Sequence, residues 1–280
     1  MKTMKMRCLW PSLNVLFSFA AALALSALIH SGPASAEDPP RPTQRLVSAF
    51  PVSAAPAQYE LVQQVLDFAP GAATRLHHHG GRAFVTVLEG QVARREGDFE
   101  AVFSRGQTFI EEAGKFHTVS NNGNVRARVF ASFLISPGQP QTINHPSSPA
   151  PALLPTVAFL GRTKLGTQPS EFTLLQVVLD FGPGGYLPWH NHGGPGLIMV
   201  IEGELAFRTD SGELRRRPGE TFRDVEPHDM RNVVSGASAS VATFLLERGQ
   251  PGTTFLDTVA AQPATSIRAP ATGDAGLAMP

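Results

Sequence analysis

Six histidines fall into two sets with nearly the same spacing. They are His77, His79 and His117 in the first set, and His190, His192 and His228 in the second. The paired histidines are separated by 113 positions between sets (190 − 77), and the third histidines by 111 (228 − 117). In a strand, residues i and i+2 point to the same face, so each pair offers two imidazoles to one ion. A third imidazole from another strand would complete each site, and the spacing therefore predicts two three-histidine metal centres.

The histidines belong to a long internal repeat. Residues 65–90, VLDFAPGAATRLHHHGGRAFVTVLEG, align with residues 178–203, VLDFGPGGYLPWHNHGGPGLIMVIEG, and residues 133–140, FLISPGQP, align with residues 244–251, FLLERGQP. A registered match of this length indicates a duplicated unit. The second copy is two residues shorter, between Phe222 and His228.

Both copies have the pattern of β-structure. Short apolar, β-branched runs are stopped at close intervals by glycine and proline, and the chain after the leader has no long helical period. This predicts an all-β protein of two tandem barrels or sandwiches. The expected organisation is a signal peptide over 1–36, a first domain over 37–140, a Pro/Ser-rich linker over 141–155, a second domain over 156–258 and a flexible tail over 259–280.

The two motifs resemble those of the cupin superfamily. The pattern G-x5-H-x-H-x3-E-x6-G, followed by G-x5-P-x-G-x2-H-x3-N, is filled in copy one by Gly71, His77, His79, Gly90, Gly106, Gly114, His117 and Asn121. Copy two has Gly184, His190, His192, Gly203, Gly219, His228 and Asn232. The resemblance covers roughly residues 45 to 255. It implies two cupin-like jelly-roll β-barrels, each with a divalent metal ion, which for imidazole ligands is Fe, Mn, Zn, Cu or Ni.

Both copies depart from that pattern at the same point. The glutamate of the first motif is Ala83 in copy one and Gly196 in copy two, so the sequence predicts three neutral imidazoles at each site. Three-histidine sites resemble those of dioxygenases that cleave diketones or dihydroxylated aromatics, whereas four-ligand sites resemble oxalate-degrading and quercetin-cleaving members. The resemblance implies a dioxygenase-like oxidoreductase that activates O2 beside a chelating substrate. A non-catalytic small-molecule-binding cupin and a metal-assisted lyase or isomerase stay open.

Other polar residues near the histidines are expected to have ordinary roles, and no catalytic acid or base is assigned. The residues near the histidines in sequence are Arg82, Glu111, Glu112, Trp189, Asp224 and Glu226. An acid among them close to the metal would serve as a general base or orient a ligand imidazole, but a solvated loop charge is the expected role of each. Asn121 and Asn232 are expected to hydrogen-bond nearby backbone. Phe109 and Phe222 are expected in the core.

The chain ends indicate export. Lys2, Lys5 and Arg7 precede an apolar run from about Leu13 to Ile29, and Ala34–Ala36 has the pattern of a cleavage site. The expected location is therefore periplasmic or secreted, with no membrane association after cleavage. The only cysteine, Cys8, would leave with the leader. The longest basic run is Arg215–Arg217, which argues against a nucleic-acid partner. The expected partner is a small-molecule substrate or ligand, and a homo-oligomer is possible.

Overall fold

The computed structural model describes residues 39–53, 58–224 and 226–256. All regular secondary structure in these ranges is β-strand. The all-β prediction is confirmed. The expected signal peptide (1–36) and the expected tail (259–280) lie outside the described residues. The expected first domain is described from Pro39 onwards. Within the described ranges, a helix with the length and apolar character of a membrane span is not found.

Each repeat contributes ten strands. The first forms β1 (Thr43–Val52), β2 (Tyr59–Phe68), β3 (His77–His78), β4 (Gly81–Glu89), β5 (Gln91–Glu96), β6 (Phe99–Ser104), β7 (Thr108–Glu111), β8 (Thr118–Ser120), β9 (Ala127–Ile135) and β10 (Ile143–Asn144). The second forms β11 (Thr156–Leu165), β12 (Phe172–Phe181), β13 (Tyr186–Asn191), β14 (Gly196–Glu202), β15 (Leu205–Thr209), β16 (Gly212–Arg216), β17 (Thr221–Asp224), β18 (His228–Asn232), β19 (Ser238–Glu247) and β20 (Thr254–Phe255).

Each barrel is built around one five-stranded antiparallel sheet. Its order is β11-β2-β9-β4-β7 in the first barrel and β1-β12-β19-β14-β17 in the second. Further sheets close the barrels: the three-stranded β6-β5-β8 and the two-stranded β10-β3 in the first, and the five-stranded β16-β15-β18-β13-β20 in the second. The turns after β4 and β14 require glycine, because Gly90 and Gly203 have φ of 65° and 68°.

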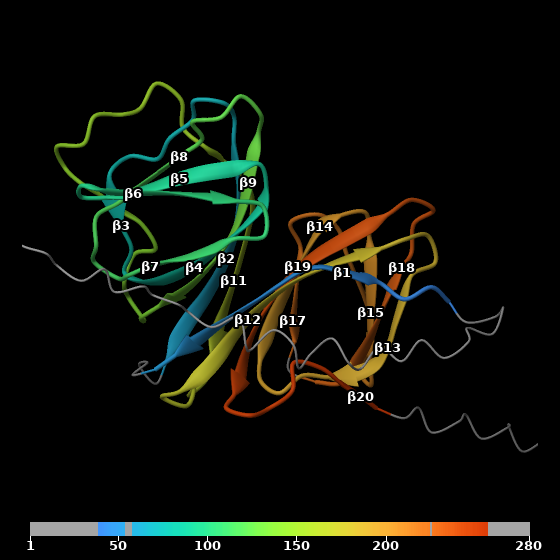
Figure 1. Cartoon of the computed structure of the whole chain (residues 1–280). Helices are drawn as coiled ribbons and strands as arrows, with labels where there is room; N and C mark the ends of the chain where they lie inside the picture. The colour runs from blue at the N-terminus through green and yellow to red at the C-terminus, as the bar shows by residue number, and fades with distance from the viewer. Residues whose placement is uncertain (1–38, 54–57, 225, 257–280) are drawn as a thin grey trace, which may run out of the picture. The chain divides into compact units, whose positions relative to one another are not determined.

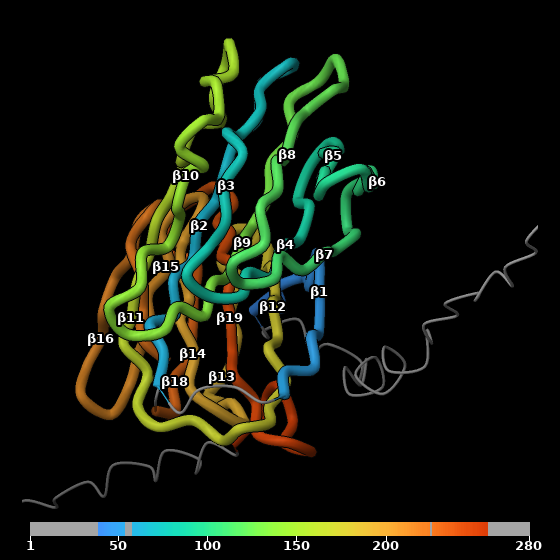
Figure 2. The backbone as a smooth tube through the Cα atoms, turned by 90° about the vertical axis from the view of Figure 1, so that its left-hand side faces the viewer, coloured from blue at the N-terminus to red at the C-terminus, as the bar shows by residue number. Residues whose placement is uncertain are grey.

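The first strand of each repeat pairs with the sheet of the other repeat. β1 lies antiparallel to β12 of the second barrel (Figure 1), and β11 lies antiparallel to β2 of the first barrel (Figure 2). The two pairings have the same register, including an irregularity at Gln44/Leu46 and at Val157/Phe159. Strand pairing therefore crosses the boundaries expected at 37–140 and 156–258. We refer to this arrangement as the strand exchange.

Alternation along the central strands explains why they are apolar throughout. In β9, Val129, Ala131 and Phe133 belong to the core inside the first barrel. Phe130 and Leu134, which point to the other face, belong to clusters shared with residues of the second repeat. Both faces of this strand are thus covered by protein.

A symmetric set of buried polar groups joins the two large sheets. Gln63 donates hydrogen bonds from its side-chain amide to Leu197 O and Thr243 Oγ1, at 2.7 and 2.9 Å. Its repeat equivalent, Gln176, donates to Phe84 O and Ser132 Oγ, at 3.0 and 2.6 Å. Because buried amides must find partners, these contacts fix how the two sheets pack against each other.

The segment expected as a linker takes part in the first barrel. Its strand β10 pairs with β3, with Ile143 opposite His78 and Asn144 opposite His77. Backbone hydrogen bonds from His145 N to Leu76 O and from Ala73 N to Leu153 O hold it there. Residues 141–155 therefore form a wall beside the first histidine set as well as connecting the repeats.

Candidate metal centres

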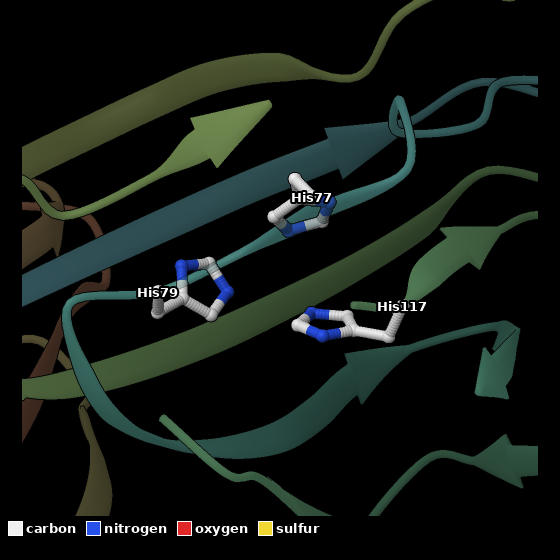
Figure 3. A group of neighbouring side chains, drawn as sticks. All are labelled: His77, His79 and His117. Carbon is white, nitrogen blue, oxygen red and sulfur yellow. The ribbon is translucent and has the colours of Figure 1, made fainter. Parts of the chain in front are cut away.

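The first histidine set is brought together inside the first barrel. His77 begins β3, His79 follows it, and His117 precedes β8 and bridges to His77. All three side chains are buried, and their ligand nitrogens lie within 4.8 Å of one another. Figure 3 shows the three imidazoles turned toward a common space. His78 points away and packs edge-on against Phe116, at 4.7 Å between ring centres.

The second set has the same arrangement in the second barrel. His190 lies on β13, His192 follows that strand, and His228 begins β18 directly opposite His190. Their ligand nitrogens also lie within 4.8 Å of one another. The structure thus assembles both predicted trios, each from two neighbouring stretches of chain.

The Nδ1 atom of every histidine in the two sets faces a backbone carbonyl. The carbonyl acceptors are those of Arg75, Gln141 and Lys115 for His77, His79 and His117, and those of Pro188, Gly252 and Glu226 for His190, His192 and His228. A carbonyl only accepts, so each Nδ1 carries a proton and a neutral ring has its lone pair on Nε2. Hydrogen bonds of this kind hold metal-binding imidazoles in a fixed orientation.

Several of the Nε2 atoms are buried without a hydrogen-bond partner among the described residues. They belong to His117, His190, His192 and His228. Buried nitrogens of this kind are costly unless a partner satisfies them, and three converging imidazole nitrogens are a suitable donor set for a first-row divalent ion. The residues present therefore fit a metal in both barrels.

Burial keeps most of these imidazoles neutral. It lowers the pKa of His77 to about 4, with the nearby His117 adding to the effect. Burial likewise lowers the pKa of His192 to about 3 and that of His228 to about 4, with His190 contributing in both cases. These rings are available to a cation throughout the neutral pH range, because protons do not compete for their Nε2 atoms.

Glu111, expected to be a solvated loop charge, is instead buried inside the first site. It ends β7, its exposed fraction is 4 %, and its carboxylate oxygens lie 3.0 Å from His79 Nε2 and 3.1 Å from His117 Nε2. Burial alone would raise the pKa of Glu111, but its close contacts with the side chains of His117 and His79 outweigh burial and hold that pKa well below its usual range. The prediction of three neutral imidazoles without a carboxylate is therefore wrong for this site.

Asp224 corrects the same expectation in the second site. It ends β17, its exposed fraction is 3 %, and its Oδ2 lies 3.1 Å from His192 Nε2. Burial raises the pKa of Asp224 to about 8. The signal for both acids was present in the repeat, because Asp224 follows Glu111 by the same 113 positions that relate the paired histidines (224 − 111).

The other neighbouring residues have the roles expected of them. Glu112 pairs with Arg82 at the surface, at 2.9 Å, and Glu226 is exposed. Asn121 donates to Phe68 O and Val125 O, and Asn232 donates to Gly182 O and Gly236 O, which confirms their backbone role. Phe109 and Phe222 are buried in the two cores, and Trp189 is half-buried beside Arg208.

A cavity of about 250 Å³ opens onto the first site. His77, His79 and Glu111 form part of its lining, and the apolar side chains of Val85, Phe109 and Phe133 form another part. Its remaining polar groups include Gln64, Thr74, Arg75, Thr142 and Asn144. Two of these, Thr142 and Asn144, come from the segment expected as a linker. The cavity therefore combines candidate metal ligands, a cation and hydrogen-bonding side chains.

The second barrel has apolar residues at most of the matching positions. Gln64, Thr74, Arg75 and Asn144 correspond to Val177, Leu187, Pro188 and Phe255. Aromatic rings also crowd the second site: His192 stacks on Phe244 at 4.0 Å, and Phe222 lies 5.0 Å from His228. The two sites thus share their histidines but differ in what surrounds them.

His79→Ala and His192→Ala, made separately, should each lower the metal content by about one ion per chain. Either change removes one of three converging imidazoles and leaves too few ligands for tight binding. The check is elemental analysis of the purified proteins after metal loading and desalting. His78→Ala is the matched control, because that ring points away from the site. Unchanged metal content in both site variants would contradict the assignment of both centres.

Comparisons with known proteins agree with this fold. Residues 64–143 match the cupin domain family. A search of curated proteins gives no match. Among solved structures, a variant of oxalate decarboxylase from Bacillus subtilis is 14% identical, with 77% of each chain covered and a TM-score of 0.52. Vicilin from Solanum melongena is 13% identical, covers 70% of this chain and 76% of its own, and has a TM-score of 0.54. At these identities the likeness concerns the fold.

Proposed function

Because the chain has the two-barrel fold of the bicupins, with a histidine set in each barrel, we propose that it is a metal-dependent enzyme whose chemistry takes place in the first barrel. The observation that carries this proposal is the cavity of about 250 Å³ that reaches His77, His79 and Glu111. It gives a small substrate direct access to the metal-binding groups. The proposed reaction is an oxidoreduction of the dioxygenase type on a small oxygenated substrate.

A first-row metal ion bound there would supply Lewis acidity and, if it is redox-active, electron transfer to O2. The protein's own residues would bind and orient the substrate. Arg75 is half-buried in the cavity wall and forms no ion pair within the described ranges, so it is placed to bind an anionic group. Val85, Phe109 and Phe133 would exclude water from the reacting end.

The second barrel would have a supporting role in this proposal. Val177, Leu187 and Pro188 replace the polar cavity residues, and Phe244 covers one face of His192. A metal held there would stabilise the fold by binding only the folded state.

Replacing Arg75 with alanine should weaken the binding of anionic ligands to the first site by about 10-fold or more, because a charge-assisted hydrogen bond is lost. Arg75→Lys should retain part of the affinity. Titration with small carboxylates and with a neutral diol would measure this effect. The neutral ligand should bind equally to all three proteins, and an equal loss for both ligand classes would contradict the role of Arg75.

Oxygen uptake tests the reaction type. Metal-loaded protein is supplied with catechols, diketones and small hydroxy or keto acids, first without oxygen and then with it. A substrate-dependent absorption band followed by oxygen consumption is the result expected of a dioxygenase. Binding without turnover in the whole panel would contradict enzymatic function and favour a small-molecule-binding cupin.

A metal-assisted lyase is the second candidate, favoured by the ionised Glu111 beside the histidines and by Arg75 in the same cavity. A buried carboxylate can transfer a proton, and an arginine can hold a substrate carboxylate, without any need for O2. Product formation from a small carboxylate under strictly anaerobic conditions would identify this activity.

Export to the periplasm or the medium is part of the proposal. It is supported by the cationic start, the apolar run and the small-residue pattern at Ala34–Ala36. N-terminal sequencing of protein recovered outside the cytoplasm should begin near Glu37. Protein that retains Met1 and fractionates with the cytoplasm would contradict it.

A further inference from the structure

We propose that the metal-binding carboxylate of each barrel has moved across a strand pair, so that Glu111 and Asp224 are the fourth ligands of the two centres. The family pattern places this acid on the strand that follows the histidine pair, where the chain has Ala83 and Gly196. The two acids lie instead on the neighbouring strand. This inference concerns metal coordination and does not depend on the proposed reaction.

The register of the sheets places the acids directly opposite the empty positions. Ala83 pairs with Glu111 between β4 and β7, and Gly196 pairs with Asp224 between β14 and β17. Residues that face each other across an antiparallel pair have Cβ atoms about 4.5–5.5 Å apart and project to the same face of the sheet. A side chain at 111 or 224 therefore enters the space that an acid at 83 or 196 would occupy.

The side-chain contacts show that both acids use this position. Glu111 lies within 3.0–3.1 Å of the Nε2 atoms of His79 and His117. Asp224 lies 3.1 Å from His192 Nε2, and its Oδ2 has no hydrogen-bond partner among the described residues. In the described part of the chain, the salt bridges of both acids are with site histidines alone. A buried carboxylate without arginine or lysine is costly to ionise, and a metal ion among the histidines would stabilise its ionised form.

Packing explains why the acid does not stand at its usual position in the second barrel. A Cβ added to Gly196 would lie 2.4 and 2.7 Å from two ring carbons of Phe244. That ring is stacked on His192, so it cannot withdraw without uncovering a ligand. A side chain at 196 and the stacked ring exclude each other, and the acid on the opposite strand avoids the conflict.

The length of each acid matches the loop that follows it. Copy two is two residues shorter between its acid and its third histidine, since Asp224 precedes His228 by four positions whereas Glu111 precedes His117 by six. The shorter loop accompanies the shorter acid. Both copies thus bring one carboxylate and three imidazoles together by slightly different local geometry.

The test measures coordination in single-site protein. In a His192→Ala background, only the first site binds, and Co(II) serves as the probe because its visible spectrum reports ligand number and type. Glu111→Ala and Glu111→Gln should weaken Co(II) binding by at least about 100-fold and change the spectrum. The double variant Ala83→Glu/Glu111→Ala, which returns the acid to the family position in the less crowded first barrel, should restore most of the affinity.

Glu112→Gln is the matched control, because it removes the adjacent acid, whose partner is Arg82. Circular dichroism of the metal-free proteins confirms that each variant is folded. A Co(II) spectrum that is unchanged in both Glu111→Ala and Glu111→Gln would overturn the proposal, since the carboxylate would then lie outside the coordination shell. Co(II) binding by Glu111 without any turnover would contradict the proposed enzymatic function and leave this inference intact.

Discussion

Asp224→Asn should make the metal-free protein more stable at pH 7 while reducing the metal bound at saturation from about two ions per chain to about one. Asp224 is buried, and burial raises its pKa to about 8 from an ordinary value of 3.8. Asparagine has nearly the same shape and cannot ionise. It therefore removes the energetic cost of a buried acid and also removes a ligand.

The sign of the pH dependence follows from that raised pKa. Below pH 3.8 the carboxyl is protonated in both the folded and the unfolded protein, so it does not change the free energy of unfolding. Between pH 3.8 and about 8 the unfolded chain loses this proton and the folded chain keeps it, so stability falls as pH rises. At pH 7 the loss is about 4 kcal/mol.

Thermal unfolding of metal-free protein between pH 4 and pH 9 checks this prediction. The gain from Asp224→Asn should be small at pH 4 and should grow to roughly 8–16 °C in Tm near pH 7. The exposed Asp210→Asn is the control and should show no such growth. A variant that is equally stabilised at every pH would contradict the assignment of the effect to Asp224 ionisation.

Phe50→Ala should lower the free energy of unfolding by about 3–5 kcal/mol and should do so for both barrels at once. Phe50 lies on β1, which completes the sheet of the second barrel, and its exposed fraction is 5 %. Its ring centre lies 5.1 Å from that of Phe84, on β4 of the first barrel. Truncating Phe50 therefore leaves a cavity between the barrels.

Chemical denaturation with two probes measures this effect. The fluorescence of Trp189 reports on the second barrel, and far-ultraviolet circular dichroism reports on both. The two curves should coincide in the wild type and shift together in the variant. Val47→Ala, on the same strand at an exposed position, should cost less than about 1 kcal/mol. Separate transitions for the two probes would contradict a shared core.

The histidine spacing was sufficient to predict both trios, because side-chain alternation in strands is a local property of the chain. The carboxylates were missed because the family pattern locates the acid by distance along the sequence, whereas Glu111 reaches the site across a strand pair. The sequence signal for these carboxylates is that an acid occurs at equivalent positions of the two repeats, 111 and 224.

The pairing of β1 with β12 and of β11 with β2 could not be predicted from sequence for a related reason. The two strands hold equivalent positions in the two repeats, so the repeat pattern does not tell which sheet each one joins. Which sheet each strand joins depends on contacts between residues more than 100 positions apart, such as those of Phe50 with Leu174. The proline and serine content of residues 141–155 predicts a connection between the repeats, but it cannot show that β10 also pairs with β3.

The strand exchange also says what one repeat could do alone. A single repeat would have an unfilled edge on its large sheet and a leading strand with no sheet of its own to join. A second identical copy would supply both, through a twofold-symmetric homodimer that swaps its amino-terminal arms. In the present chain the two repeats are covalently joined, so each leading strand joins the sheet of the other repeat within one molecule. Covalent joining also lets the two halves differ, as Gln64 and Arg75 of the first barrel differ from Val177 and Pro188 of the second.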